Sequence, residues 1–287
     1  MKPAPFRYLR PRTVEEALEA LREPDAKALA GGQNLITLMN MRLARPSLVV
    51  DLGGLHELRR SFDDDGQVIL GALLTHRDLI EHPTLAARHP IIGEMASHIG
   101  HTAIRNRGTL GGSLAHADPA GELPAAMVLL GAEIHADSLE RGRRTIRAED
   151  FFEGHYETVL EPDELLAWVT VPDRVPGQGW GFVEHAHRHG DYAVAGAAVL
   201  VGTDRTGRPQ SVRAGLLNAG ETPVLIEATG DDVPDGSDWE WWARAMTADL
   251  EPGVEDLDHV RAVAARALAQ ASAQAHVRAL AELEEQR

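Results

Sequence analysis

Residues 99–124 read IGHTAIRNRGTLGGSLAHADPAGELP, with the glycine run Thr109–Ser113 near the centre. Another glycine pair, Gly31-Gly32, lies about eighty residues earlier in the run AGGQNL. In chain order, AGGQNL at 30–35 is the first run and Thr109–Ser113 is the second run. Each run follows a stretch with the pattern of ordered structure and leads toward a helical pattern. We therefore expect two glycine loops, each placed before a helix.

A glycine pair lets the backbone adopt positive φ and leaves main-chain N–H groups uncovered, so that they can close on an anion. The helix start that follows adds its unsatisfied N–H groups and its positive dipole end. Each run also ends in a small polar residue at a plausible N-cap, Asn34 in the first and Ser113 in the second. Two such loops can hold two phosphates, which is what a dinucleotide pyrophosphate requires.

The composition excludes several kinds of partner and site. The 287-residue chain has 28 Lys and Arg against 44 Asp and Glu, a net charge of −16 that argues against nucleic acid as a partner. It contains no cysteine, so disulfides, a cysteine nucleophile and an iron–sulfur cluster held by this chain are excluded. No apolar run is long enough for a membrane span and no secretory signal is evident, so we expect a cytoplasmic protein.

The sequence closely resembles the FAD-binding medium subunit of the molybdenum hydroxylases, a family that includes xanthine dehydrogenase and aerobic carbon monoxide dehydrogenase. The runs at 30–35 and 99–124 carry the resemblance, together with RLARPSLVVDL at 42–52. PFRYLRPRTVEEALEAL at 5–21 looks like the family's opening strand and helix, and RHGDYAVAGAAV at 188–199 looks like the start of its C-terminal domain. The resemblance covers nearly the whole chain.

The resemblance implies an α+β fold, with a two-subdomain PCMH-type FAD-binding domain followed by a smaller α+β C-terminal domain of antiparallel sheet and helices. We expect the FAD-binding domain over 1–176, with subdomains at about 1–55 and 56–176, and the C-terminal domain over 177–287. The turn-rich run 172–179 is the expected boundary.

Hydrophobic periodicity predicts a succession of short mixed elements, of which the first helix has the capping-box pattern Thr13-x-x-Glu16. The predicted helices cover 14–21, 35–43, 75–81, 90–99, 123–130, 238–250 and 257–283. The predicted strands cover 27–30, 47–52, 67–70, 133–136, 144–147, 165–171, 182–186, 194–201 and 212–217.

By resemblance, the FAD-binding residues form two loops and several single positions. They are Leu29, Ala30, Gly31, Gly32, Gln33, Asn34, Leu35, Ile36, His76, Ile99, Thr109, Gly111, Gly112, Ser113, Asp118, Glu122, Leu166 and Tyr192. The N–H groups of 31–34 would face the pyrophosphate, and the Thr109 and Ser113 hydroxyls can donate to phosphate oxygens. Leu166 would reach the isoalloxazine through its backbone, and Tyr192 would cover one flavin face and control access of an electron acceptor.

Several of these positions also have simpler interpretations. Asp118 precedes Pro119 and can serve as a helix-start cap instead of a ligand. Tyr192 can be an ordinary packing residue, and a lone histidine such as His76 is more often structural than a ligand. The run Asp63-Asp64-Asp65-Gly66 is typical of a turn, because it lacks the spaced oxygen ligands of a calcium site.

Two features of the second domain depart from the simple picture. Phe182 is followed by Val183 and Glu184, where the family often has a lysine, and a missing cation near the flavin would weaken stabilisation of its anionic reduced form. The histidines at 185, 187 and 189 would share one face of a strand, so a zinc or copper site is a competing interpretation, although we expect no metal.

The function expected from the resemblance is that of an oxidoreductase subunit with no catalytic acid or base of its own. Electrons would come from two [2Fe–2S] clusters on a small subunit, which receives them from a molybdenum cofactor on a large subunit. FAD on this chain would pass them to NAD⁺, a quinone or oxygen within a hetero-oligomer. The alternative is a stand-alone flavoenzyme of the same fold that oxidises a small substrate directly.

Overall fold

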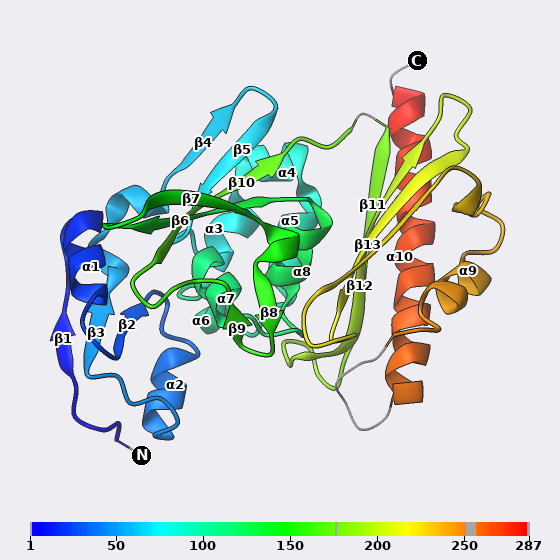
Figure 1. Cartoon of the computed structure of the whole chain (residues 1–287). Helices are drawn as coiled ribbons and strands as arrows, with labels where there is room; N and C mark the ends of the chain where they lie inside the picture. Colours follow the sequence, from blue (N-terminus) through cyan, green and yellow to red (C-terminus); the bar gives the residue numbers. More distant parts are fainter. Residues whose placement is uncertain (1, 176, 251–256, 286–287) are drawn as a thin grey trace.

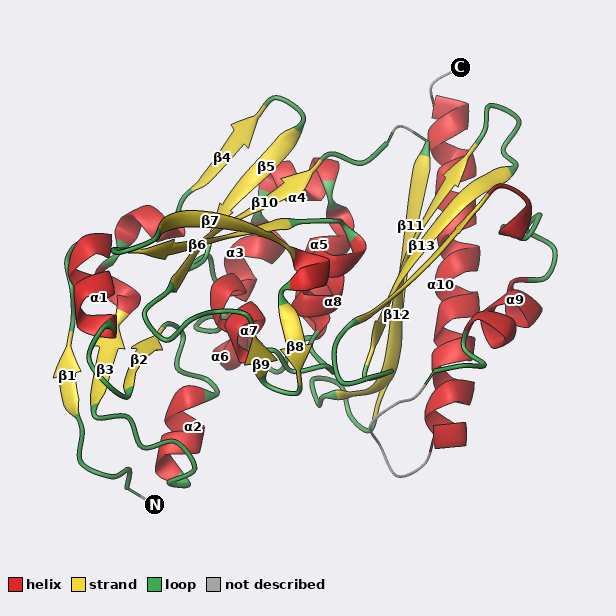
Figure 2. Cartoon of the chain, viewed as in Figure 1, coloured by secondary structure: helices red, strands yellow, loops and turns green. Residues whose placement is uncertain are grey.

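The computed structural model describes residues 2–175, 177–250 and 257–285, and Pro176, the expected end of the first domain, lies outside the described residues. The chain forms three successive units, each built on its own sheet (Figure 1). The first two lie side by side, and the third packs against the second (Figure 2).

The first unit is a small parallel sheet with strand order β1-β3-β2. Its first helix is capped as predicted, because the Thr13 hydroxyl accepts a bond from the Glu16 N–H at 3.2 Å. Ala17, Leu18 and Leu21 of that helix are buried against the sheet. The elements are β1 (Arg7–Leu9), α1 (Val14–Leu21), β2 (Ala26–Leu29), α2 (Leu35–Asn40) and β3 (Leu48–Asp51).

The second unit is an antiparallel sheet with strand order β4-β5-β10-β6-β7, packed on a group of short helices. Its strands are β4 (Ser61–Asp64), β5 (Gln67–Gly71), β6 (Glu133–Ser138), β7 (Gly142–Arg147), β10 (Leu165–Pro172) and the separate hairpin β8 (Phe152–Gly154) and β9 (Glu157–Thr158). Its helices are α3 (His76–Glu81), α4 (Pro83–Arg88), α5 (Pro90–His98), α6 (Thr102–Arg105), α7 (Leu110–His116) and α8 (Glu122–Leu129).

The third unit is an antiparallel sheet with strand order β11-β12-β13-β14, and the long helix α10 lies along one of its faces (Figure 1). Helices α5 and α8 of the second unit pack on the other side, so all eight residues of α8 are buried. The elements are β11 (Gln178–Ala186), β12 (Ala193–Thr203), β13 (Pro209–Leu217), β14 (Val224–Thr229), α9 (Trp239–Met246) and α10 (Leu257–Glu285).

The hydrophobic core of the second unit continues into the third. Phe182, Ala198 and Leu217 of the third sheet belong to the same buried cluster as Leu123 and Phe151. This shared core fixes the beginning of β12 beside α5 and α8, which is the position that matters for the site described below.

The predicted α+β fold is confirmed, and each predicted helix and strand has a counterpart. In the run at 63–66, Asp63 and Asp64 end β4, while Asp65 and Gly66, with φ 78° at Gly66, form the turn to β5. The predicted second glycine loop was wrong, since Gly111 and Gly112 lie in the first turn of α7. Among the described residues, no helix combines the length and the apolar character that a membrane span requires.

A glycine in β11 allows the sheet to approach α10 closely. A Cβ atom at Gly179 would lie 1.7 Å from the Ala275 carbonyl oxygen, so we expect Gly179→Ala to lower the free energy of unfolding by about 3 kcal/mol. Gly154→Ala is the control, because its Cβ would meet only Glu157 Oε2 at 3.7 Å.

The measurement is urea unfolding followed by tryptophan fluorescence, since four of the five tryptophans lie beyond residue 176. Equal unfolding midpoints for the two variants would contradict the close-approach interpretation.

Candidate functional site

A cavity of about 510 Å³ lies where the three units meet. All of the residues singled out from the sequence line it except Leu29 and Ile36. The first unit contributes the run at 30–35, the second contributes residues from α3, α6, α7, α8, β10 and the segment after α5, and the third contributes 190–192. Segments far apart in sequence are therefore brought together around one space.

Gly31 and Gly32 of the first run are required for different structural reasons. Gly32 has φ 76°, the left-handed conformation that favours glycine. Gly31 instead allows a close approach, because a Cβ there would lie 2.1 Å from the Arg107 carbonyl oxygen. The first run is thus pressed against the segment that connects α6 to α7.

The first run also presents free hydrogen-bond donors. Among the described residues, none accepts a backbone hydrogen bond from the N–H groups of Gly31, Gly32, Gln33 or Asn34. Asn34 stands at the predicted N-cap of α2, but its side chain makes no capping bond. Because unpaired N–H groups are costly away from water, such a row of donors fits an anionic ligand.

The second run is arranged differently from the prediction. Its N–H groups are already used, since Gly111 donates to the Ala72 carbonyl at 2.8 Å and Gly112 donates to Thr109 Oγ1 at 3.1 Å. Thr109 is therefore the N-cap of α7, and the prediction of Ser113 as a cap was wrong. The side chains of Thr109 and Ser113, rather than the glycine N–H groups, remain to meet a ligand.

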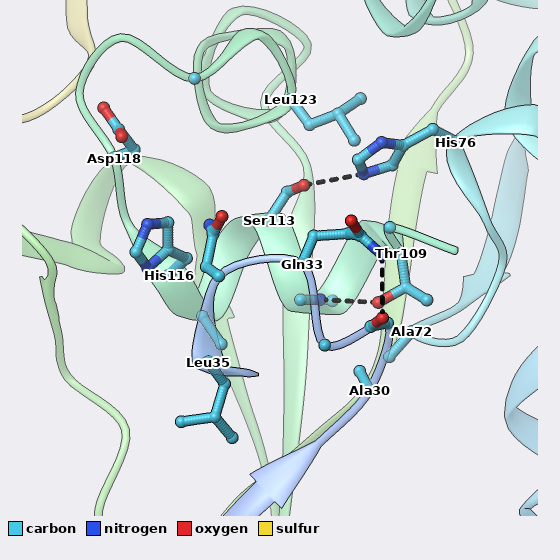
Figure 3. Close-up of a pocket in the computed structure, with 18 of the residues that line it drawn as sticks. Ala30, Gln33, Leu35, Ala72, His76, Thr109, Ser113, His116, Asp118 and Leu123 are labelled. Carbon is cyan, nitrogen blue, oxygen red and sulfur yellow. Dashed lines mark hydrogen bonds between the residues drawn. The ribbon is translucent and has the colours of Figure 1, made fainter. Parts of the chain in front are cut away.

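Ser113 is held by a buried histidine. His76 Nε2 lies 2.9 Å from Ser113 Oγ, and Figure 3 shows the two side chains pointing toward one another. His76 is 3% exposed, and this burial lowers its pKa to about 4. A ring that is neutral at physiological pH can fix the direction of the Ser113 hydroxyl without adding charge.

Acidic and aromatic side chains also line the cavity, namely Asp118, Glu122 and Tyr192. Burial raises the pKa of Glu122 to about 8, with Glu184 and Asp118 acting in the same direction. Asp118 does not cap α8, whose N-cap is Gly121; its Oδ1 accepts a bond from the Ala120 N–H at 3.0 Å, so that prediction was wrong.

Tyr192 reaches the cavity from the third unit. Loss of hydration is the main cause that raises the pKa of its hydroxyl to about 12, and the charges of Asp118 and Glu122 also raise it. The turn before it is pressed on the second unit, because Gly190 has φ 87° and a Cβ there would lie 2.8 Å from the Gly100 carbonyl oxygen. The ring is therefore anchored through its backbone while much of its surface stays exposed.

Sequence reasoning missed part of the cavity wall. Lys27 is the only Lys or Arg among the described lining residues, and Gly100 and Gly108 adjoin residues that were predicted. The remaining unpredicted lining residues include Leu52, Ala72, Leu73, Ile104, Leu123, Pro124, Leu160 and Leu165. Most of them have only the apolar pattern of core residues, which gives no signal for a site.

The competing metal interpretation has no geometric support. Only His185 of the three histidines lies within β11, and the described part of the chain contains no group of three ligating side chains placed to hold a metal. Glu184 stands out in the sequence because the family often has a lysine there. Its carboxylate lies 3.0 Å from His98 Nδ1.

A comparison with protein families matches residues 4–174 to the model described as "FAD binding domain in molybdopterin dehydrogenase". The chain belongs to this family. It is therefore an FAD-dependent oxidoreductase subunit, and FAD is its cofactor.

Curated relatives and solved structures agree with this assignment. Nicotine 6-hydroxylase medium subunit from Paenarthrobacter nicotinovorans is 40% identical, covering 91% of this chain and 90% of the relative. Caffeine dehydrogenase subunit beta from Pseudomonas sp. (strain CBB1) is 38% identical, covering 82% and 83%. A structure of carbon monoxide dehydrogenase from Hydrogenophaga pseudoflava matches with TM-score 0.92 and 33% identity, covering 97% of this chain and 99% of that chain.

The residues around the cavity fit FAD. A dinucleotide carries a pyrophosphate that needs several donors, and the free N–H groups at 31–34 and the hydroxyls of Thr109 and Ser113 face the same space. The apolar side chains of Ile99, Leu123 and Leu166 can pack on ring surfaces.

The close approach at Gly31 gives a direct test of the FAD site. We expect Gly31→Ala to weaken FAD binding by more than about tenfold, because the new Cβ must push the loop away from Arg107 and displace its N–H groups. Gly93→Ala is the control, since its Cβ would have no neighbour closer than 3.7 Å.

Titration of FAD into each variant, followed by quenching of flavin fluorescence, measures the affinities, and circular dichroism checks that each variant is folded. Unchanged affinity in folded Gly31→Ala would show that this loop does not hold the cofactor.

Proposed function

We propose that this chain is the FAD-carrying electron-transfer subunit of a multi-subunit molybdenum hydroxylase. Electrons from [2Fe–2S] clusters on a partner chain would pass through its FAD to an external acceptor, which is NAD, a quinone or oxygen. The observation that carries the proposal is the row of unpaired N–H groups at 31–34 in a cavity shared by all three units. The absence of cysteine supports the placing of the clusters on another chain.

In this proposal the cofactor lies extended along the cavity. The N–H groups of Gly31 to Asn34 bind the pyrophosphate, and Thr109 and Ser113 add hydroxyl donors, with Ser113 oriented by His76. The ring system lies toward Ile99 and Tyr192, where the second and third units meet. The side chains at the other predicted positions complete the walls.

The protein residues supply binding, orientation and electrostatics rather than acid–base catalysis. When bound, FAD supplies the ability to accept and release electrons. The apolar walls around Ile99 and Leu166 exclude water from one side, while the exposed ring of Tyr192 borders the side that remains open. An acceptor would approach from that side.

The partners in this proposal are an iron–sulfur small subunit and a molybdenum-cofactor large subunit. It draws support from relatives whose own names describe them as medium or beta subunits. The division into an FAD-binding domain over 1–176 and a C-terminal domain over 177–287, and a cytoplasmic location, belong to the same proposal.

The electron route predicts a dependence on the iron–sulfur subunit. Adding the reducing substrate to the complete complex under anaerobic conditions should bleach the flavin absorption of this chain. The same addition to a preparation without the iron–sulfur subunit should leave the flavin oxidised, because electrons can then no longer reach the flavin through the clusters.

Absorption spectra before and after substrate give the result, and a chemical reductant added last confirms that the flavin remains reducible. Full bleaching without the iron–sulfur subunit would contradict the route and favour a flavoenzyme that oxidises its substrate directly.

A further inference from the structure

Glu122 is a buried carboxyl group at the wall of the FAD cavity. It is the first residue of α8, is 6% exposed and lines the cavity beside Leu123 and Pro124. No Lys or Arg among the described residues forms an ion pair with it. A buried carboxylate without a cationic partner is strongly unfavourable, so its position alone favours the neutral acid.

The histidine whose charge acts on Glu122, His98, already forms an ion pair with a second acid, Glu184. His98 Nδ1 at the end of α5 lies 3.0 Å from Glu184 Oε1, and the Glu184 side chain is 5% exposed. The other oxygen, Oε2, is buried and has no hydrogen-bond partner in the described structure. The cluster therefore contains two buried carboxyl groups and one imidazole, which cannot neutralise both.

We propose that Glu122 faces the cavity as a neutral carboxylic acid that donates a hydrogen bond to the cofactor, with Glu184 as the positioning residue that keeps it protonated. The inference rests on the proposed function, in which this cavity holds FAD. It assigns Glu122 the role of a donor, where an ionised carboxylate could only accept.

The charges around Glu122 agree with this assignment. Burial is the main cause that raises its pKa to about 8. A hydrogen bond from the Glu122 backbone N–H lowers the pKa, Glu184 on β11 and Asp118 before α8 raise it, and His98 on α5 lowers it. Glu94, also on α5, acts on His98 and helps raise the pKa of that imidazole. The charge of Glu184 thus favours the protonated form of Glu122, and His98 opposes it.

A neutral acid suits this ligand for an electrostatic reason. FAD carries two phosphate charges and gains further negative charge when its ring is reduced, so an ionised Glu122 would repel it. The O–H group of the neutral acid instead offers a donor to ring or ribityl oxygens. Ionisation of Glu122 would both remove the donor and add repulsion.

The pH dependence of FAD binding follows from this arrangement. Below about pH 8 Glu122 is protonated and the affinity should be constant; above that pH the free protein loses a proton that binding requires. We expect the affinity of the full chain to fall by up to about tenfold for each further pH unit. The measurement is FAD titration, followed by flavin fluorescence, between about pH 6 and pH 10.

Two variants distinguish this role from a structural one. Glu122→Gln cannot ionise, so the fall in affinity above pH 8 should disappear. Glu184→Gln removes a like charge, so the fall should begin at lower pH. Glu153→Gln, on the exposed middle of β8, is the matched control and should keep the profile of the unaltered chain.

Infrared spectroscopy gives a reading that does not depend on the cofactor. At neutral pH the unaltered chain should show the carbonyl stretch of a protonated carboxylic acid, and Glu122→Gln should lack it. An affinity that is constant up to pH 10, or an identical acid band in both proteins, would overturn the inference and leave the FAD site intact. Failure to bind FAD at any pH would overturn both the inference and the proposed function.

Discussion

The site depends on two close contacts that only glycine permits. At Gly31 the first run is pressed against the Arg107 carbonyl, and at Gly111 the start of α7 is pressed against Ala72, where a Cβ would lie 2.6 Å from the Ala72 Cβ. The Gly31 contact joins the first unit to the second, and the Gly111 contact holds the start of α7 against the segment after β5 within the second unit. The residues of the first run line the cavity, and the N–H groups of 31–34 have no backbone partner among the described residues.

Burial then sets the charge of the cavity. His76 and Glu122 both line the ligand space, and loss of hydration drives both toward their neutral forms, the base by lowering its pKa and the acid by raising it. The cavity therefore offers uncharged hydrogen-bonding groups next to free N–H donors, although the chain as a whole carries a net charge of −16. Such an interior suits an anionic dinucleotide that the protein surface would otherwise repel.

The sequence predicted the element types well because most helices and strands have clear periodicity, and the family resemblance gave the fold. It failed at the second glycine run, where Thr109 caps a helix that already contains both glycines. The run looks like a loop because glycine is a poor helix former, and the close contact with Ala72 explains a glycine at position 111 of the helix. Apolar lining residues such as Leu52 and Leu73 were also missed, since the same pattern serves core and cavity wall alike.

The central claim is that the three units form one FAD cavity, and the visible absorption spectrum of the purified full chain tests it most directly. The account predicts flavin bands and release of FAD on denaturation, at about one FAD per chain once the protein is saturated with added cofactor. A colourless chain that takes up no FAD, or one that releases a flavin without the adenylate half, would contradict it, because the free N–H groups at 31–34 would then have no pyrophosphate to bind.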